Sequence, residues 1–140
     1  MLEESFEKLY LKFRAHYCRD LFRQMGAREG SLTATEAYCL EVVYLLGHPT
    51  LREFSDYVGI SAPNATYRIN TLAAKGYVER VASEKDRRTV RLRVTDKFRN
   101  YYGLYDAYNA NLMKNIREQF SAEEVRSLES MIERIVHDMM

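Results

Sequence analysis

The chain of 140 residues has no tryptophan, two prolines, two cysteines and six glycines, and it has no long apolar run. Its longest mainly apolar stretch, around residues 42–46, is far too short to cross a membrane. The first ten residues, MLEESFEKLY, are acidic and amphipathic rather than basic and then apolar, so we expect no signal peptide. These absences predict a cytoplasmic protein with no membrane partner.

Cysteine and histidine are too few and too scattered for the familiar cofactor and metal sites. Cys18 and Cys39 do not form a CxxC pair, and without a secretory signal we expect no structural disulfide. His16, His48 and His137 lack metal-ligand spacing. The sequence contains no phosphate-binding glycine loop, HExxH motif or GxSxG motif. We therefore expect no metal, no cofactor and no enzyme activity.

The formal net charge is only +1, but the charges are unevenly distributed. Residues 68–99 contain ten basic and four acidic side chains, which leaves the rest of the chain acidic. A basic segment of this kind indicates a surface that faces a polyanion. A solvated face with local ion pairs explains the same charges equally well, so composition alone does not decide between the two.

Capping signals and apolar spacing divide the chain into helices and one hairpin. Capping boxes, in which Ser or Thr is followed three residues later by Glu, begin at Thr33, Thr50 and Ser121. Gly59 stands where a left-handed helix cap is wanted. A change to alternating Val, Tyr and Arg predicts two strands joined by the charged loop SEKDRR. The expected elements are helices over 2–25, 33–46, 50–58, 61–76, 95–116 and 121–139, and strands over 77–82 and 89–94.

The order of these elements is helix-turn-helix followed by a two-stranded wing. In helix-turn-helix modules the second helix lies in the DNA major groove, with its N-terminal residues toward the bases. We therefore predict a mainly α fold with a small β-hairpin wing, flanked by N- and C-terminal dimerisation helices. The expected organisation is a single domain over 1–140, with a DNA-binding lobe at about 32–100 and helical dimerisation regions at about 1–28 and 101–140.

The stretch SAPNATYRINTL, residues 61–72, is unusually polar for a short helix. With Ile69 toward the core and about 100° per residue, Asn64, Tyr67 and Thr71 point outward, with Arg68 on the flank. The core side of the same helix then carries Ala62, Ala65, Leu72, Ala73 and Gly76. Ordinary exposed faces favour Glu and Lys, whereas Asn, Arg and Tyr can contact base edges or phosphates. The candidate DNA contacts of this helix are Ser61, Pro63, Asn64, Thr66, Tyr67, Arg68 and Thr71.

Two segments carry a family resemblance: GISAPNATYRINTLAAKGYVER at 59–80 and DRRTVRLRVT at 86–95. Together they resemble the MarR-type (multiple antibiotic resistance regulator) winged-helix transcription factors, and the likeness runs from about residue 32 to residue 102. Asp86, Arg88 and the pair Val94-Thr95 match the wing of that family. The resemblance implies that Asp86 braces the wing and that the wing arginine reaches into the minor groove. The candidate DNA contacts of the wing are Lys85, Asp86, Arg87 and Arg88.

The resemblance also implies a homodimer that binds a palindromic operator, usually as a repressor relieved by a small-molecule or oxidant signal. The chain departs from the family at two positions. Arg68 stands where the family often has Leu, and Phe98 stands where a Gly usually follows the wing Thr. Arg68 is therefore either a base or phosphate contact special to this chain or a side chain that extends from a half-buried position.

The first and last helices carry more apolar residues than a winged helix needs, including Phe6, Phe13, Leu128 and Ile135. These stripes either meet those of a second copy in a C2 dimer or pack on the chain's own long helix. The first alternative agrees with the homodimer that the resemblance implies.

Tyrosines and a cysteine leave a sensing role open. The cluster Tyr101, Tyr102, Tyr105 and Tyr108 either lines an inducer cleft or belongs to a core or interface. Cys18 is either an oxidant sensor or a free core cysteine. The alternative to a DNA-binding regulator is therefore a dimeric ligand- or redox-sensing winged-helix module that does not bind DNA.

Overall fold

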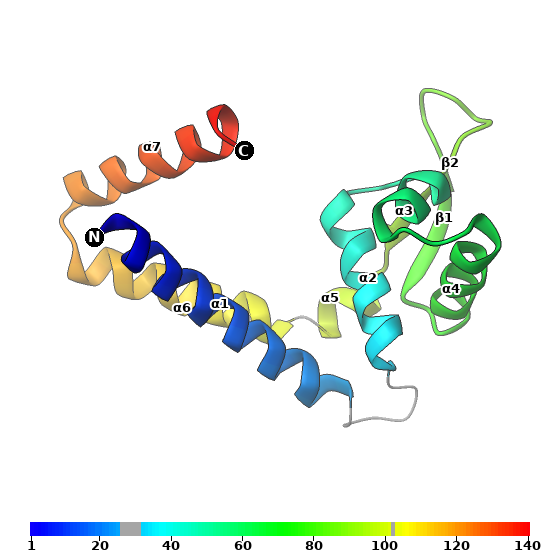
Figure 1. Cartoon of the computed structure of the whole chain (residues 1–140), viewed down its shortest axis with the longest axis horizontal. Coiled ribbons are helices and arrows are strands. Elements are labelled where there is room, and N and C mark those ends of the chain that lie inside the picture. Colours follow the sequence, from blue (N-terminus) through cyan, green and yellow to red (C-terminus); the bar gives the residue numbers. More distant parts are fainter. Residues whose placement is uncertain (26–31, 102) are drawn as a thin grey trace. The chain divides into compact units, whose positions relative to one another are not determined.

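A computed structural model describes residues 1–25, 32–101 and 103–140, which form two compact units, 1–103 and 104–140 (Figure 1). The predicted mainly α fold with a hairpin wing is confirmed. Unit 1 contains all the strands among the described residues, and β1 pairs antiparallel with β2. The elements are α1 Leu2–Met25, α2 Ala34–Leu46, α3 Leu51–Val58, α4 Ala62–Ala74, β1 Val78–Ala82, β2 Val90–Val94, α5 Asp96–Tyr101, α6 Gly103–Gln119 and α7 Ala122–Asp138.

Local capping chemistry sets the helix boundaries, as the sequence predicted. All three capping boxes form; at Thr50 the hydroxyl accepts from the Glu53 N–H at 3.1 Å, while the Thr50 N–H donates to the Glu53 carboxylate at 3.3 Å. Gly59 is left-handed, with φ 75°, and its N–H donates to the Ser55 carbonyl at 2.9 Å. Because these bonds satisfy groups at helix ends, they define the turn between α3 and α4.

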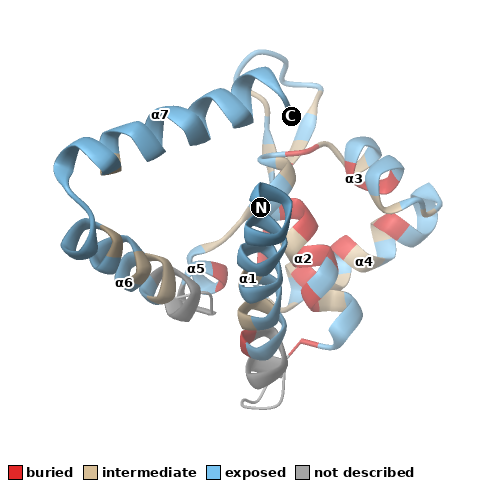
Figure 2. Cartoon of the chain, turned by 60° about the vertical axis from the view of Figure 1, so that its left-hand side comes forward, coloured by how far each residue is buried: buried red, intermediate tan, exposed pale blue. Residues whose placement is uncertain are grey.

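One apolar core lies between α2, α3, α4 and the hairpin of unit 1, where Figure 2 shows the buried residues gathered. Each fully buried side chain of this size contributes about 1.5–3 kcal/mol relative to an exposed one, so the core fixes how α4 is rotated. Its largest fully buried members include Leu40, Val43, Phe54, Ile69, Leu72, Leu92 and Phe98.

The base of the wing is fastened to the start of α3. The Leu92 N–H donates to the Pro49 carbonyl at 2.7 Å, and Arg91 forms an isolated antiparallel bridge with Thr50. The Arg91 guanidinium also donates to the His48 carbonyl at 3.1 Å. Strand β2 is therefore held on both edges, by β1 on one side and by residues 48–50 on the other.

The region after the wing is helical, as the sequence predicted. Within the helix predicted over 95–116 the structure describes α5 and α6, and Tyr102 between them lies outside the described residues. The hydroxyl of Thr95, just before α5, donates to the Gly76 carbonyl at 2.6 Å. Phe98 is 2% exposed, and its ring centroid lies 5.1 Å from that of Tyr44. The departure from Gly at this position therefore adds a core side chain.

The apolar stripes of the first and last helices remain largely exposed. On α1, Phe6 is 62% exposed, and on α7, Ile132 and Ile135 are 51% and 43% exposed. None of residues 107–140 is buried, so α7 does not bury its stripe against α6. A shallow apolar groove at the α6–α7 corner is lined by residues that include Ile116, Phe120 and Leu128. Among the described helices, none has the length and apolarity that a membrane crossing requires.

The left-handed cap gives a test of the turn between α3 and α4. A Cβ added at Gly59 would meet nothing within 4 Å, so the cost of Gly59→Ala is backbone strain alone. We expect Gly59→Ala to lower the free energy of unfolding by about 1 kcal/mol. Gly59→Asn should cost clearly less, because Asn tolerates the left-handed region. Urea unfolding at one fixed protein concentration measures both variants, and equal effects would contradict the strain explanation.

Candidate nucleic-acid interface

Helix α4 presents a capped, polar N-terminus to solvent. Ser61 is its N-cap and accepts from the Asn64 N–H at 3.3 Å, and Pro63 lies in the first turn. Ile69 is fully buried, as predicted, together with Ala65 and Leu72. The buried side of the helix is shorter than the sequence predicted. Ala73 is half-buried, and Ala62 and Gly76, at the two ends of the predicted helix, are exposed.

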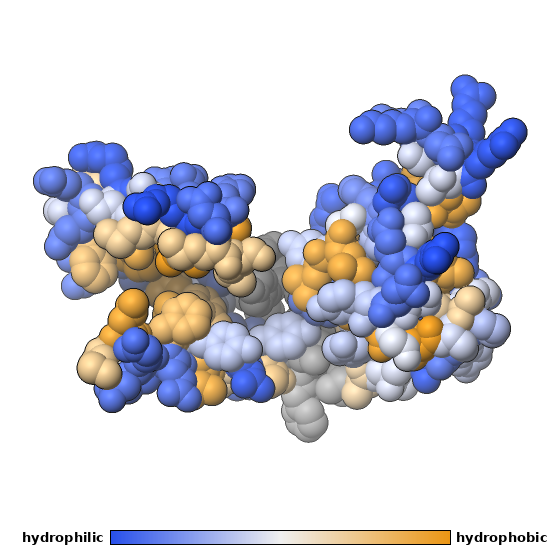
Figure 3. All heavy atoms as spheres, turned by 45° about the horizontal axis from the view of Figure 1, so that its top comes forward, coloured by the Kyte–Doolittle hydropathy of each residue, from blue (hydrophilic) through white to orange (hydrophobic). Residues whose placement is uncertain are grey.

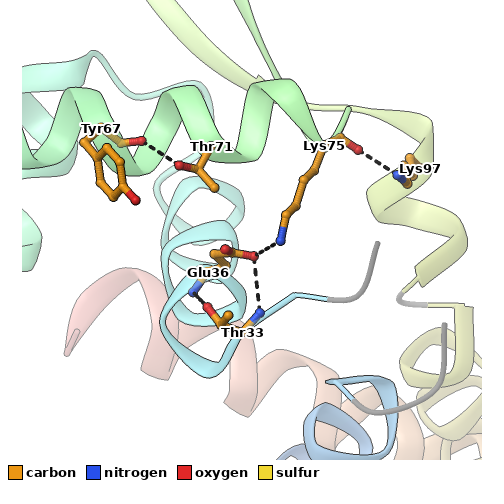
Figure 4. A network of polar contacts seen from close by, with 6 residues as sticks. All are labelled: Thr33, Glu36, Tyr67, Thr71, Lys75 and Lys97. Carbon is orange, nitrogen blue, oxygen red and sulfur yellow. Dashed lines mark hydrogen bonds and ion pairs between the residues drawn. The ribbon is translucent and has the colours of Figure 1, made fainter. Parts of the chain in front are cut away.

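The exposed face of α4 is rotated slightly from the one that the sequence predicted. Pro63, Asn64 and Tyr67 are exposed, with Tyr67 at 65%, but Thr71 is half-buried. The Thr71 hydroxyl donates to the Tyr67 carbonyl at 3.0 Å (Figure 4). The hydroxyl of Thr66, which is also half-buried, donates in the same way to the Ala62 carbonyl at 2.9 Å. Both threonines therefore use their proton within the helix and offer only acceptor lone pairs outward.

Arg68 lies on the α2 side of the helix and is half-buried. Its guanidinium carbon is 5.8 Å from the ring centroid of Tyr67. Burial raises the pKa of the Cys39 thiol on α2, and the positive charge of Arg68 offsets part of that rise. The half-burial of Arg68 agrees with the half-buried alternative for this departure from the family.

The C-terminal end of α4 is fixed by a polar network that Figure 4 shows. The Lys75 ammonium lies 2.6 Å from the Glu36 carboxylate, which also accepts from the Thr33 N–H at 3.2 Å. The Lys97 ammonium donates to the Lys75 carbonyl at 2.6 Å and lies 4.5 Å from the ring centroid of Tyr77. Because the Glu36 side chain is only 13% exposed, this pair is less screened by water than a surface pair.

Asp86 closes the wing loop. Its carboxylate accepts from the Arg88 N–H at 2.9 Å and from the Thr89 hydroxyl at 3.0 Å. The Asp86 carbonyl accepts from the Thr89 N–H, also at 3.0 Å. The Arg88 N–H, followed by the Thr89 hydroxyl, lowers the pKa of Asp86 below its ordinary value. The bracing that the resemblance implied for this aspartate is therefore observed.

The basic segment divides into two kinds of cation. At the wing base and on α4, several cations are paired with carboxylates: Arg91 with Glu53 at 3.7 Å, Arg93 with Glu79 at 2.5 Å and Lys75 with Glu36. At the wing tip, Lys85, Arg87 and Arg88 are exposed, and their side chains form no ion pair with any residue that the structure describes. Figure 3 shows strongly hydrophilic side chains projecting from the wing. The ion-pair interpretation therefore holds for the wing base and α4, whereas the cations of the wing tip stay available to a polyanion.

Two residues beside this surface were not nominated from the sequence. Asn70 is exposed on α4, and its Oδ1 accepts from Nη2 of Arg80 on β1 at 2.7 Å. By helical spacing Asn70 lies on the flank opposite Arg68, whereas the predicted outward face consisted of Asn64, Tyr67 and Thr71. The approach of Arg80 depends on the packing of α4 against β1, which spacing within α4 does not reveal.

The candidate sensing residues are only partly described. The side chains of Tyr101, Tyr102 and Tyr105 lie outside the described residues, and Tyr108 is half-buried. Cys18 is exposed on α1, so its interpretation as a core cysteine is wrong; the buried cysteine is Cys39. The reason is that α1 buries little of its surface in the single chain. Among the residues that the structure describes, no three His, Cys, Asp or Glu side chains form a group that could hold a metal ion.

Comparisons with known proteins agree with this geometry. Residues 31–89 match the model of the MarR family. The chain is 28% identical over 100 residues to YkoM of Bacillus subtilis (strain 168), which is named as an uncharacterised HTH-type transcriptional regulator. The aligned residues cover 71% of this chain and 61% of that protein. The chain thus spans about three-fifths of the length of this curated relative.

Two crystal structures share the fold over nearly the whole chain. Streptococcus pneumoniae FabT in complex with DNA superposes with a TM-score of 0.57 at 24% identity, covering 97% of this chain and 95% of that chain. A mutant MarR from E. coli complexed with operator DNA superposes with a TM-score of 0.53 at 19% identity, covering 94% and 93%. The capped polar helix and the braced wing give this chain a winged helix-turn-helix fold, and its residues 31–89 are similar to the MarR family.

Proposed function

We propose that this protein is a sequence-specific DNA-binding transcriptional regulator, a homodimeric repressor that binds a palindromic operator in the cytoplasm. The observation that carries the proposal is the exposed polar N-terminal half of α4 in the same unit as a wing whose three tip cations are unpaired among the described residues. A helix of this kind fits the major groove. FabT and the E. coli MarR, which share the fold, were each crystallised with DNA.

The residues divide into two roles in this proposal. Asn64 and Tyr67 are the exposed side chains that would contact base edges, with Arg68 beside them on the α2 side. Ser61, Pro63, Thr66 and Thr71 complete the helix surface that faces the groove. On the wing, Arg88 would enter the minor groove, Lys85 and Arg87 would contact phosphates, and Asp86 would hold the loop. A sensing module without DNA binding would leave the unpaired cations of the wing tip unexplained.

The dimer is the second part of the proposal, and the exposed apolar stripes of α1 and α7 support it. A C2 interface would bury these faces together with the groove that Ile116, Phe120 and Leu128 line.

A small-molecule or oxidant inducer is the third part of the proposal. Cys18 is the exposed thiol through which an oxidant would act.

We expect the purified protein to sediment at micromolar concentration with about twice the chain mass of 16.5 kDa. Leu128→Arg should shift it toward the monomer, because the substitution places a charge within the apolar stripe of α7. Ser130→Arg, on the opposite side of the same helix, is the matched control and should leave the mass unchanged. A stable wild-type monomer would contradict the dimer and the palindromic operator with it.

Asn64→Ala separates sequence reading from general DNA binding. On an operator selected from a random-sequence duplex library, the variant should lose about 1–3 kcal/mol of binding free energy, because the lost bond is to a base edge. On unselected duplex DNA it should lose little. Arg87→Ala, the comparison variant, should weaken both kinds of duplex alike. Fluorescence anisotropy measures all four affinities, and an equal loss for Asn64→Ala on both duplexes would place α4 outside the major groove.

The wing gives a separate prediction. Arg88→Ala should weaken binding to all duplexes, and most at sites with a narrow A/T minor groove, which attracts arginine. Asp86→Ala should have a similar effect, because it removes the acceptor that holds the Arg88 N–H and the Thr89 hydroxyl. If both variants bind A/T-rich duplexes as tightly as wild type, the wing does not enter the minor groove.

Acid provides a check on the Asp86 brace. Because its pKa is lowered in the folded protein, the brace is fully present above the ordinary aspartate pKa and is lost as pH falls through the lowered pKa. The amide NMR signal of Arg88 should therefore stay constant at neutral and mildly acidic pH and shift only below the ordinary aspartate range. In Asp86→Asn, which keeps the size of the side chain, this acid transition should be absent.

A further inference from the structure

The exposed stripe of α4 continues beyond the helix through an arginine from the hairpin. Pro63, Tyr67, Asn70 and Ala74 are all exposed, and their spacing places them on one line along the helix surface. At Asn70 this line meets Arg80 of β1, whose Nη2 donates to the Asn70 Oδ1 at 2.7 Å. The guanidinium of Arg80 therefore lies directly beside the helix face that the proposed function assigns to the major groove.

The register of the hairpin explains why Arg80 extends to this side. Arg80 pairs with Leu92, and residues that oppose each other in an antiparallel pair project from the same face of the sheet. Leu92 is 1% exposed within the core, so Arg80 leaves the sheet on the face that α4 covers. Glu79 and Arg93 oppose each other one position away and project from the other face.

Charge distinguishes Arg80 from the other two arginines of the strands. Arg93 is paired with the Glu79 carboxylate, and Arg91 lies 3.7 Å from the Glu53 carboxylate. Arg80 is bonded to a neutral amide, and it has no carboxylate partner among the residues that the structure describes. The Arg80 guanidinium has five N–H donors, and the bond to Asn70 uses one of them. The other donors are available, in the planar arrangement that matches a phosphate group.

The position of Arg80 along the chain identifies which part of DNA it would meet. In the proposed complex α4 lies in the major groove and the wing lies in the neighbouring minor groove, so one sugar-phosphate strand runs between them. Arg80 lies between the two elements, since it is bonded to the C-terminal half of α4 and belongs to the strand that leads into the wing. N-terminal residues of a recognition helix approach the bases, which leaves the backbone for contacts near its C-terminal half.

We propose that Arg80 binds a phosphate of the DNA strand that separates the two grooves, and that Asn70 orients its guanidinium for this contact. The inference rests on the proposed function and adds to it a DNA-binding residue supplied by β1. The contact carries no base information, so it affects selected and unselected DNA equally. It fixes the position of the helix and the wing relative to the same strand.

The test is a salt series with a labelled duplex of mixed sequence. Arg80→Gln should weaken binding several-fold and reduce the magnitude of the slope of log K against log salt by about 0.9 per subunit. Arg93→Gln is the matched control, because it also removes a hairpin arginine but one that is already paired with Glu79; its slope should equal that of wild type. Arg80→Lys keeps the charge and should keep the wild-type slope. A wild-type slope in Arg80→Gln, or a reduced slope in Arg80→Lys, would overturn the proposal.

A second variant separates phosphate binding from a structural role for the same bond. Asn70→Asp gives Arg80 a carboxylate partner, so the thermal unfolding temperature should stay the same or rise while DNA affinity falls several-fold. Because the new carboxylate also repels phosphates by itself, the loss of affinity should be smaller when Asn70→Asp is made in the Arg80→Gln background than in wild type. Unchanged affinity in Asn70→Asp overturns the proposal even if Arg80→Gln fails to fold. Wild-type protein in the same titration tests the proposed function separately: absence of duplex binding by wild type refutes that function, whereas wild-type binding with an unaffected Arg80→Gln slope refutes only the inference about Arg80.

Discussion

Burial of one side of α4 is the constraint on which the rest of the recognition surface depends. Ala65, Ile69 and Leu72 are fully enclosed in the core, and rotating the helix by even one residue position would expose at least one of them. The cap at Ser61 fixes where the helix begins, and the Lys75–Glu36 pair holds its far end against α2. With the rotation, start and end of α4 all fixed, the outward direction of Asn64 and Tyr67 follows.

The same packing sorts the cations of the basic segment by their surroundings. Near the core, carboxylates of neighbouring elements lie within ion-pairing distance, so Lys75, Arg91 and Arg93 are neutralised within the protein. The wing loop extends away from those elements, and only the acceptor groups of Asp86 hold its backbone. The charges of Lys75, Arg91 and Arg93 thus stabilise the structure, whereas those at the wing tip stay available, which suits a polyanion partner.

The two units differ in how far they bury their apolar residues within the single chain. The winged helix of unit 1 has a closed core, and its capping, pairing and strand register agree with one another. Unit 2 buries none of the side chains at 107–140, although α7 has a well-formed capping box and a continuous apolar stripe. Local chemistry is therefore sufficient for the helix to begin at Ser121, whereas packing within the α6–α7 pair leaves its apolar face exposed.

The sequence by itself determined the elements that local chemistry controls. The capping boxes at Thr33, Thr50 and Ser121 and the left-handed Gly59 depend on residues a few positions apart, and helical spacing placed Ile69 in the core. Only the tertiary structure decided which polar side chains are exposed and which are covered by, or bonded to, another element. Packing between elements accounts for the half-burial of Thr71 and Arg68, for the bond from the Thr95 hydroxyl to Gly76 and for the approach of Arg80 to Asn70. Spacing along one helix gives a direction for each side chain, but the neighbour that covers or pairs with it comes from a distant part of the chain.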